Sequence, residues 1–328
     1  MASGGQVKIV VPDDNPSVFK DTEAQRRLEK SGDVTLYTSD AADAPALIER
    51  LKGAAIAVNI RGRTKFTREV MAALPQLRLI SIWGTGTDNM DLAAARELGV
   101  CIMNTPGVGA IAMAEGTLAL MLAAAKRTAQ IDADVKRGTW PRVRHVQLHG
   151  KVLGIVGTGA IGRQMARLGR GIGMEVIAWT YHPDEAVARE IGFRYVGLEE
   201  LLRTADVVSL HVRLSPEATG MIGRAQLALM KPTAILVNTA RGAVVDHAAL
   251  VEALRDGRLA AAGIDVYPVE PVPANDPILS LSNAVLSPHA AGATPEAGLA
   301  GMILSADNVA DFLAGRPKAQ YVVVPGTR

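Results

Sequence analysis

The sequence predicts an α/β protein with two domains, each built on a parallel β-sheet. The chain has 328 residues, which is enough for two separate hydrophobic cores. Short apolar segments rich in branched residues alternate with segments of helical periodicity. The connections between them are short, which is typical of parallel strands covered by helices on both faces of the sheet. Asn104-Thr105-Pro106-Gly107 interrupts the alternation, and we place the domain boundary between residues 104 and 105.

The first half of the chain contains the elements of one such sheet. We expect strands at Val7–Val11, Val34–Tyr37, Ala54–Ile60, Leu79–Trp83 and Cys101–Met103, and helices at Ala24–Lys30, Ala46–Lys52, Glu69–Leu74 and Asp91–Leu98. In a parallel sheet, ligands bind in the loops at the carboxyl ends of the strands. Any site in this half is therefore expected in those loops.

Two of these loops have suitable chemistry. The segment Asn59-Ile60-Arg61-Gly62-Arg63-Thr64 carries two arginines, whose guanidinium groups either bind an anionic substrate or only face water. The segment Trp83-Gly84-Thr85-Gly86-Thr87-Asp88-Asn89 is rich in glycine. Its backbone N–H groups at Thr85 and Gly86 either hold a small carboxylate or belong to a plain tight turn.

A long helix is expected next, from about Ala110 to Arg137. It is rich in Ala, Leu and Met and has few residues suited to a fully solvated face. We therefore expect it to be packed on both sides, by its own domain and by a partner subunit.

The most informative stretch is Lys151–Gly162, which reads KVLGIVGTGAIG. Val152–Val156 has the branched, apolar character of a strand buried on both faces. Gly157, Gly159 and Gly162 follow in the G-x-G-x-x-G spacing, and a helical pattern begins at Ala160. Strand, glycines and helix in this order predict a dinucleotide-binding turn, with the pyrophosphate at the amino end of the helix. The alternative is an ordinary glycine-rich turn.

The second half continues the alternation. We expect strands at Glu175–Trp179, Val207–Leu210, Ile235–Asn238, Ala260–Asp265 and Ala284–Leu286, and helices at Leu198–Leu202, Arg224–Met230, Ala248–Arg255 and Pro295–Ala314. An NAD site usually has Asp or Glu at the end of the second strand, where it binds the ribose hydroxyls. This chain has Thr180-Tyr181-His182-Pro183 there instead.

Three segments after later strands carry side chains suited to reducing a ketone. They are Asn238-Thr239-Ala240-Arg241-Gly242, Asp265-Val266-Tyr267-Pro268-Val269-Glu270-Pro271 and Ser287-Pro288-His289-Ala290-Ala291-Gly292. Histidine can donate a proton near neutral pH, and a nearby carboxylate favours its charged form. Arginine offers a planar fork to a carboxylate. Each residue alone is open to a structural explanation, and their convergence on one sheet edge favours catalysis.

With these segments in this order and spacing, the chain resembles the D-isomer-specific 2-hydroxyacid dehydrogenase family over essentially its whole length. The resemblance implies two doubly wound parallel-sheet domains with a cleft between them. One is a flavodoxin-like substrate domain of residues 1–104 and 295–328. The other is a Rossmann NAD(P)-binding domain of residues 105–294. It further implies a homodimer formed through the nucleotide domain and its long helix.

The resemblance also implies roles for individual residues. Arg241, Glu270 and His289 match the catalytic set, with His289 as the acid and base, Glu270 as its carboxylate partner and Arg241 on the substrate carboxylate. Arg61, Thr85, Gly86 and Arg241 are the expected substrate contacts. The expected NAD(P) contacts are Gly157, Gly159, Ala160, Ile161, Gly162, Thr180, His211, Val212, Thr239, Ala240, Arg241, Asp265, His289 and Gly292. Thr180 replaces the family's usual Asp, so we expect NADP to be tolerated.

Composition and motifs argue against several other kinds of partner and site. The 35 basic and 33 acidic residues are spread along the chain, so nucleic acid and membrane are poor partners. The single cysteine, Cys101, lies in an apolar stretch and suits a buried structural thiol. No His, Cys or carboxylate pattern suggests a metal. The amino terminus leads directly into a strand, and we expect a cytoplasmic protein.

Two alternatives stay open at this point. The family has co-repressor relatives that sense nucleotides on the same fold, and fold alone does not fix function. Relatives that oxidise formate carry Gln where Glu270 stands, and those that oxidise phosphite carry a lysine near the glycine-rich substrate loop, which this chain lacks. The substrate's side chain is open: glyoxylate, hydroxypyruvate, phosphoglycerate and bulkier acids all fit the pattern.

Overall fold

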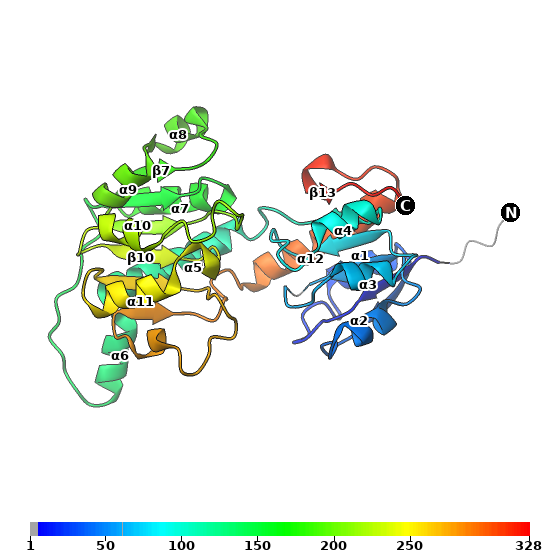
Figure 1. Cartoon of the computed structure of the whole chain (residues 1–328), viewed down its shortest axis with the longest axis horizontal. Helices are drawn as coiled ribbons and strands as arrows, with labels where there is room; N and C mark the ends of the chain where they lie inside the picture. The colour runs from blue at the N-terminus through cyan, green and yellow to red at the C-terminus, as the bar shows by residue number, and fades with distance from the viewer. Residues whose placement is uncertain (1–5, 61) are drawn as a thin grey trace. The chain divides into compact units, whose positions relative to one another are not determined.

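The computed structural model describes residues 6–60 and 62–328, and the chain divides into two compact units (Figure 1). Unit 1 comprises Met1–Gly109 and Thr294–Arg328, and unit 2 comprises Ala110–Ala293. The sequence-based domain boundaries fall at residues 104/105 and 294/295. They differ from the boundaries in the structure by five residues at the first position and by one at the second. In Figure 1, unit 1 combines the blue and cyan beginning of the chain with its orange and red end.

Unit 1 is a six-stranded sheet with helices on both faces. Its strands are β1 (Lys8–Val11), β2 (Asp33–Leu36), β3 (Ile56–Asn59), β4 (Leu79–Ile82), β5 (Cys101–Met103) and β13 (Val322–Val324). Its helices are α1 (Glu23–Glu29), α2 (Ala44–Leu51), α3 (Arg68–Ala72), α4 (Leu92–Glu97) and α12 (Pro295–Leu313), followed by a 3₁₀ turn, η3 (Ala319–Tyr321). The order β13-β5-β4-β3-β1-β2 contains the flavodoxin-like order 2-1-3-4-5.

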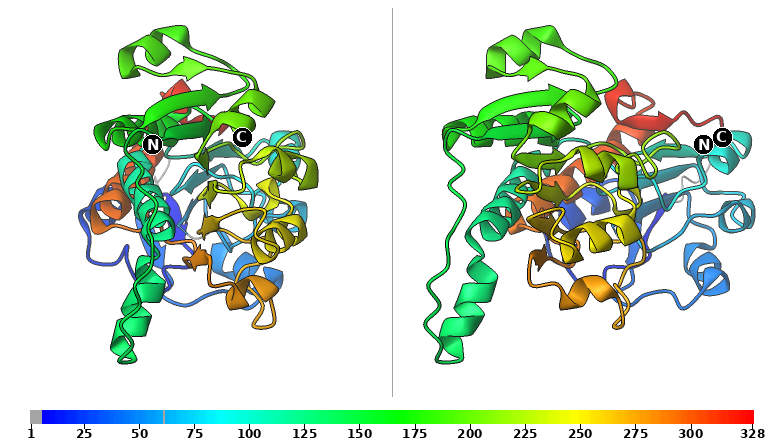
Figure 2. Two further views of the ribbon diagram at one scale, coloured as in Figure 1. Left: turned by 90° about the vertical axis from the view of Figure 1, so that its left-hand side faces the viewer. Right: turned by 60° about the vertical axis from the view of Figure 1, so that its left-hand side comes forward.

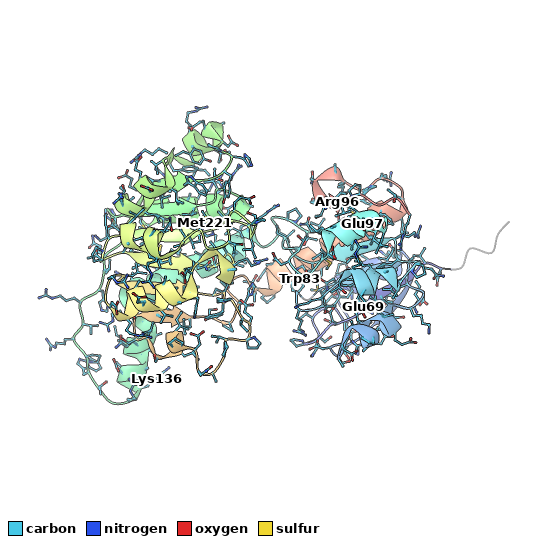
Figure 3. The ribbon with its side chains drawn as sticks, viewed as in Figure 1. Glu69, Trp83, Arg96, Glu97, Lys136 and Met221 are labelled. Atoms are coloured by element: carbon cyan, nitrogen blue, oxygen red, sulfur yellow. The ribbon has the colours of Figure 1, made fainter. Side chains whose placement is uncertain are left out.

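The last strand of unit 1 departs from an all-parallel sheet. β13 pairs with β5 in the antiparallel sense, with Val322 opposite Met103 and Val324 opposite Ile102. The remaining pairs in this sheet are parallel. The chain reaches this edge through α12, which packs against α1 and β4. Trp83, directly after β4, lies against α12 (Figure 3), where a side chain at Gly301 would collide with its ring.

Unit 2 is a seven-stranded sheet whose paired strands are all parallel. Its strands are β6 (Val152–Val156), β7 (Glu175–Trp179), β8 (Arg194–Tyr195), β9 (Val207–Leu210), β10 (Ile235–Asn238), β11 (Ala261–Ile264) and β12 (Ala284–Leu286). Its helices are α5 (Ala110–Lys126), α6 (Thr128–Lys136), α7 (Ala160–Gly171), α8 (Glu185–Ile191), α9 (Leu198–Thr204), α10 (Arg224–Leu229) and α11 (His247–Arg255), with 3₁₀ turns η1 (Gly242–Val244) and η2 (Pro277–Ser280).

The strand order of unit 2 positions its loops for ligand binding. The order β12-β11-β10-β9-β6-β7-β8 corresponds to the Rossmann order 3-2-1-4-5-6 extended by one strand. β6 lies at the point where the order reverses, between β7 and β9. The turn after β6 therefore opens into the crevice that such sheets use for nucleotides.

The inner strands are apolar because they are buried on both faces, whereas the edge strands β2, β8 and β12 are only partly buried. Two clusters of buried side chains cover the two faces of each sheet. Most helix starts are fixed by polar side chains: Thr22, Asp43, Thr67, Asp91, Asp184, Asp246 and Thr294 each accept a backbone N–H of the first turn. This is the usual N-cap contact.

The prediction of one long helix from Ala110 to Arg137 is wrong. The helix breaks at Arg127, which adopts the left-handed conformation with φ of 53° and separates α5 from α6. α5 packs against α7 and the strands β10 and β11. α6 has no buried residue, so the expected packing against its own domain fails in this half. Figure 2 shows α6 and the segment that returns from it projecting from unit 2 as an arm.

Candidate active site

The turn after β6 has the geometry that its three glycines suggest. Gly157 has φ of 98°, and a Cβ there would lie 2.8 Å from the backbone of His211. A Cβ on Gly162 would lie 2.0 Å from the carbonyl oxygen of Gly157, so α7 approaches the strand closely. Gly159 is the N-cap of α7 without a side-chain cap, and a Cβ there would meet nothing within 4 Å. The helix end thus has open space where a pyrophosphate would lie.

The edge of this turn is held by a network that the sequence did not reveal. The hydroxyl of Tyr195 lies 2.9 Å from Thr158 Oγ1, between the first two glycines, and accepts the N–H of Asp184 at 3.2 Å. The carboxylate of Asp184 pairs with Arg163 of α7 at 3.5 Å. Tyr195 comes from β8 and Asp184 caps α8, two elements absent from our prediction. The network therefore connects the glycine turn to the segment after β7.

That segment lacks a carboxylate at its first position. Thr180 directly follows β7 and is partly buried. Tyr181 and His182 are exposed, and the Tyr181 ring stands edge-on to Trp179 at 4.8 Å. The first acidic group, Asp184, is turned to its own helix and to Arg163.

His211 and Val212 follow β9, next to the glycine turn. His211 Nε2 lies 2.9 Å from Ser209 Oγ, and burial lowers the pKa of His211 to about 4. The ring is therefore neutral at pH 7. Val212 is buried and closes this strand end with an apolar side chain.

The loop after β10 carries Arg241 and is fixed by Asn238. The Asn238 side chain accepts the N–H of Ala240 and donates to the carbonyl of Arg241, both at 3.0 Å. Thr239 is buried and contacts Thr117 of α5 through the two hydroxyl groups at 2.8 Å. Arg241 donates to the carbonyl of Ala240 at 2.8 Å and is partly buried. The guanidinium is thus presented from a rigid turn.

The structure brings two of the predicted catalytic residues together. His289 Nδ1 lies 2.7 Å from Glu270 Oε2, and the other oxygen of this carboxylate accepts the N–H of Tyr267 at 2.9 Å. The Tyr267 hydroxyl in turn donates to the carbonyl of Ser287 at 3.1 Å, so the two loops are cross-connected. The loop that carries Arg241 packs closely against the loop of Glu270, since a Cβ on Gly242 would lie 2.0 Å from the carbonyl carbon of Tyr267.

Asp265 fixes the loop that carries His289 by accepting its backbone N–H groups. Its buried carboxylate accepts the N–H groups of Ala290 at 2.8 Å and of Ala291 at 3.1 Å. Its carbonyl accepts the N–H of His289, which has φ of 55°. These bonds stabilise an unfavourable left-handed backbone at the histidine. Gly292 lies beside Met113 of α5, so the loop and this helix are closely packed.

In unit 1, the loop after β4 exposes backbone donors. Gly84 donates its N–H to the Thr105 hydroxyl at 2.8 Å, and its carbonyl accepts the N–H of Thr105 at 3.0 Å. Asn104 donates from its side chain to the carbonyl of Thr85 at 2.9 Å. Neither Thr85 nor Gly86 donates its own N–H to another described residue. Such a fixed turn with free N–H groups suits a carboxylate. The other predicted contact, Arg61, lies outside the described residues.

The described part of the chain was expected to hold neither a metal site nor a membrane-spanning helix. No group of three or more His, Cys, Asp or Glu side chains there is arranged to hold a metal ion. No described helix is long and apolar enough to cross a membrane.

The sequence is similar to one family model and to curated proteins that are named as reductases and dehydrogenases. Residues 118–291 match the model of the D-isomer specific 2-hydroxyacid dehydrogenase, NAD binding domain. A glyoxylate reductase of Aeropyrum pernix is 43% identical over 257 residues, covering 76% of this chain and 77% of that protein. A D-3-phosphoglycerate dehydrogenase of Methanocaldococcus jannaschii is 39% identical over 306 residues, covering 92% of this chain. This chain spans 58% of that dehydrogenase's length.

Among solved structures, an acyclic imino acid reductase in complex with NADPH and D-Arg is similar to this chain with a TM-score of 0.88. The sequences are 26% identical, and the match covers 97% of this chain and 100% of the other.

Proposed function

Because the chain belongs to the D-isomer specific 2-hydroxyacid dehydrogenases, a family of nicotinamide-dependent oxidoreductases, we propose that it interconverts a small 2-keto acid and the D-2-hydroxy acid. The pairing of His289 with Glu270 is the observation that carries the proposal. A histidine fixed by a carboxylate at the carboxyl edge of a nucleotide-binding sheet is suited to transferring a proton.

His289 acts as the acid in reduction and as the base in oxidation. Its Nδ1 is bound to Glu270, so Nε2 is the nitrogen that faces the substrate oxygen. A bound nicotinamide supplies or receives the hydride at the substrate carbon. As negative charge develops on the carbonyl oxygen, His289 delivers its proton there from Nε2. Glu270 fixes the ring and stabilises the imidazolium that precedes this transfer.

Arg241 binds and orients the substrate carboxylate. Its planar fork can donate hydrogen bonds to both carboxylate oxygens and polarise the adjacent carbonyl. The N–H groups of Thr85 and Gly86, which have no described acceptor, would hold the same carboxylate, and Arg61 is the further expected contact. These assignments leave the side chain of the keto acid to other residues.

The cofactor is held by the strand-end loops of unit 2. Gly159, Ala160, Ile161 and Gly162 present the amino end of α7 to the pyrophosphate. The other contacts in the proposal are Gly157, Thr180, His211, Val212, Thr239, Ala240, Arg241, Asp265, His289 and Gly292. Because Asp265 already binds two backbone N–H groups through its carboxylate, we assign it chiefly to shaping the loop.

The proposal includes acceptance of NADPH. A carboxylate at the position of Thr180 would bind the ribose hydroxyls and repel a 2′-phosphate, and Thr180 brings no such charge. The NADPH complex of the similar imino acid reductase supports the same direction.

Thr180→Asp should shift preference toward NADH by about tenfold or more, which is 1.4 kcal/mol in transition-state terms. The measurement is kcat/KM for NADH and NADPH in both proteins. Strict use of NADH by the parent protein, unchanged in the variant, would mean that discrimination lies elsewhere.

The decisive experiment is a panel of 2-keto acids with NADH and NADPH, followed by nicotinamide absorbance. Glyoxylate and hydroxypyruvate should be reduced, and the product should be the D-enantiomer where it is chiral. Absence of turnover with every acid would overturn the proposal. The relatives reported above are named as a reductase and a dehydrogenase, which gives no support to the co-repressor alternative.

A further inference from the structure

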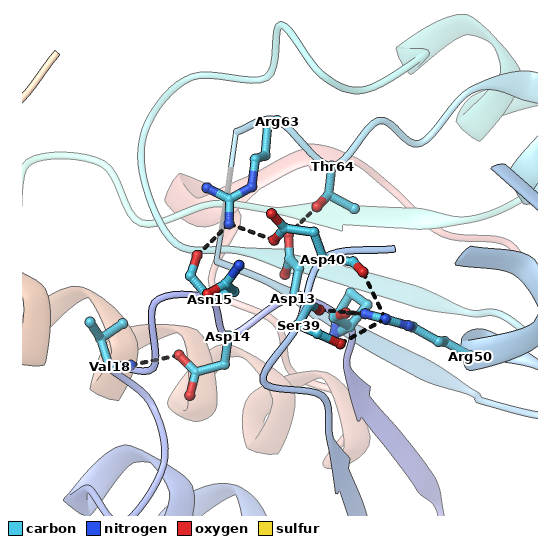
Figure 4. A network of polar contacts seen from close by, with 10 residues as sticks. Asp13, Asp14, Asn15, Val18, Ser39, Asp40, Arg50, Arg63 and Thr64 are labelled. Atoms are coloured by element: carbon cyan, nitrogen blue, oxygen red, sulfur yellow. Dashed lines mark hydrogen bonds and ion pairs between the residues drawn. The ribbon is translucent and has the colours of Figure 1, made fainter. Parts of the chain in front are cut away.

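The loop after β3 carries a second arginine whose position was not anticipated. From the sequence, the guanidinium of Arg63, like that of Arg61, is expected either to bind an anionic substrate or only to face water. In the structure, Arg63 Nη2 lies 2.6 Å from Asp40 Oδ1 and also donates to the carbonyl of Asn15 (Figure 4). The side chains of Arg63 and Asp40 are about half exposed, at 49% and 46%. Arg63 is thus bound to protein groups and still accessible to solvent.

The sheet order shows the direction in which Arg63 points. β3 lies between β4 on one side and β1 on the other, with β2 beyond β1. Asn15 follows β1 and Asp40 follows β2, so Arg63 reaches across the side away from β4. The loop with Thr85 and Gly86 follows β4. Asp40 therefore draws Arg63 away from the side on which the substrate carboxylate is proposed to bind.

The position of Asp40 is itself well defined. Arg50 donates to the carbonyls of Pro12, Ser39 and Asp40 at 2.5–2.8 Å, and its guanidinium stacks over the Tyr37 ring at 4.7 Å. Hydrogen bonding to Arg63 keeps the pKa of Asp40 below its usual value, so the carboxylate is charged at neutral pH. A second network fastens the same loops, because Thr64 donates to the buried Asp13.

We propose that Asp40 is a specificity-determining residue that disfavours keto acids carrying a second anionic group, so that the enzyme prefers substrates with a small uncharged side chain. A phosphate on the substrate's far end would need a free guanidinium, because arginine binds phosphate through its planar fork. The Asp40 carboxylate already forms an ion pair with the guanidinium of Arg63 and places a negative charge beside it. The inference rests on the proposed function, since it concerns the substrate of that same site.

The test compares hydroxypyruvate with its 3-phosphate, two acids that differ only in the phosphate group. The parent protein should have the higher kcat/KM with hydroxypyruvate. Asp40→Asn should raise the ratio of kcat/KM, phosphorylated to unphosphorylated, by about fivefold, the effect of losing one exposed charge pair. Adding Arg63→Gln to Asp40→Asn should abolish this gain, because the gain depends on the released guanidinium.

Asp33→Asn is the matched control, because Asp33 is an exposed aspartate at the amino end of β2, the opposite end of the strand that leads to Asp40. It removes the same charge and should leave the ratio unchanged. Asp40→Ser serves as a second variant if Asp40→Asn does not fold.

Each outcome distinguishes this inference from the proposed function. If the protein turned over neither of these acids nor any other 2-keto acid, that result would contradict the proposed function. Turnover with a preference for the phosphorylated acid in the parent protein would overturn the role of Asp40 alone. So would an unchanged ratio in both Asp40 variants, or a gain that persists in the double variant.

Discussion

At the scale of single residues, the histidine pair provides the sharpest prediction. His289→Ala should lower kcat by about 10²–10⁴-fold, the usual contribution of a positioned acid. NADPH binding, measured by fluorescence titration, should be largely retained, because the imidazole is one of many proposed cofactor contacts and its main role is at the carbonyl oxygen. His247 offers a matched control: it also pairs with a carboxylate, Asp276, at 2.9 Å in the same unit. His247→Ala should keep turnover, and equal losses in both variants would remove His289 from the mechanism.

The candidate residues illustrate what side-chain chemistry can and cannot predict. Glu270 and His289 could be proposed from the sequence because both follow strands of one predicted sheet and, with Arg241, match the motifs of the family. Asn238 and Tyr267 could not, because an amide and a phenol at strand ends have no distinctive pattern. Their roles depend on which backbone groups the fold brings within reach.

At the scale of elements, two glycines of the same helix test the nucleotide turn. Gly162 and Gly171 both belong to α7, but a Cβ would lie 2.0 Å from Gly157 O in the first case and meet nothing within 4 Å in the second. Gly162→Ala should lower the melting temperature and weaken NADPH binding, because α7 must move from the strand. Gly171→Ala should be neutral or stabilise by up to about 1 kcal/mol through helix propensity.

Thermal melts and NADPH titrations of the two variants check this. Comparable destabilisation by both substitutions would show that helix propensity, and not the close approach at Gly162, controls the turn.

The elements themselves were largely predictable where the apolar pattern was strong. β5, β6, β9 and β10 have the predicted bounds, because buried parallel strands are short continuous apolar runs. The break at Arg127 was not predictable, because neither Gly nor Pro marks it. β8 has only two residues, and α8 is a short amphipathic helix, so neither gave a clear signal.

At the scale of the whole molecule, we propose a homodimer that uses the arm of unit 2. We define the arm as residues 128–145, which comprise α6 and most of the returning segment (Figure 2). No residue of α6 is fully buried in its own chain, and Lys136 lies at its end (Figure 3). Val135 and Trp140 are 45% and 81% exposed. A large exposed aromatic side chain on an extension without a core suits an interface, where such residues contribute most of the binding energy.

Trp140→Asp should therefore convert the dimer to a monomer, because a desolvated charge would replace an apolar contact. The measurement is mass by light scattering after size-exclusion chromatography, over a range of protein concentrations. Leu279→Asp is the control, since Leu279 is also exposed, at 46%, and belongs to η2 outside the arm. A parent protein that is monomeric at every concentration, or a dimer that persists in Trp140→Asp, would contradict this interface. The Trp140→Asp variant should keep the secondary structure of the parent protein, because the Trp140 side chain is 81% exposed and lies outside the buried core of unit 2.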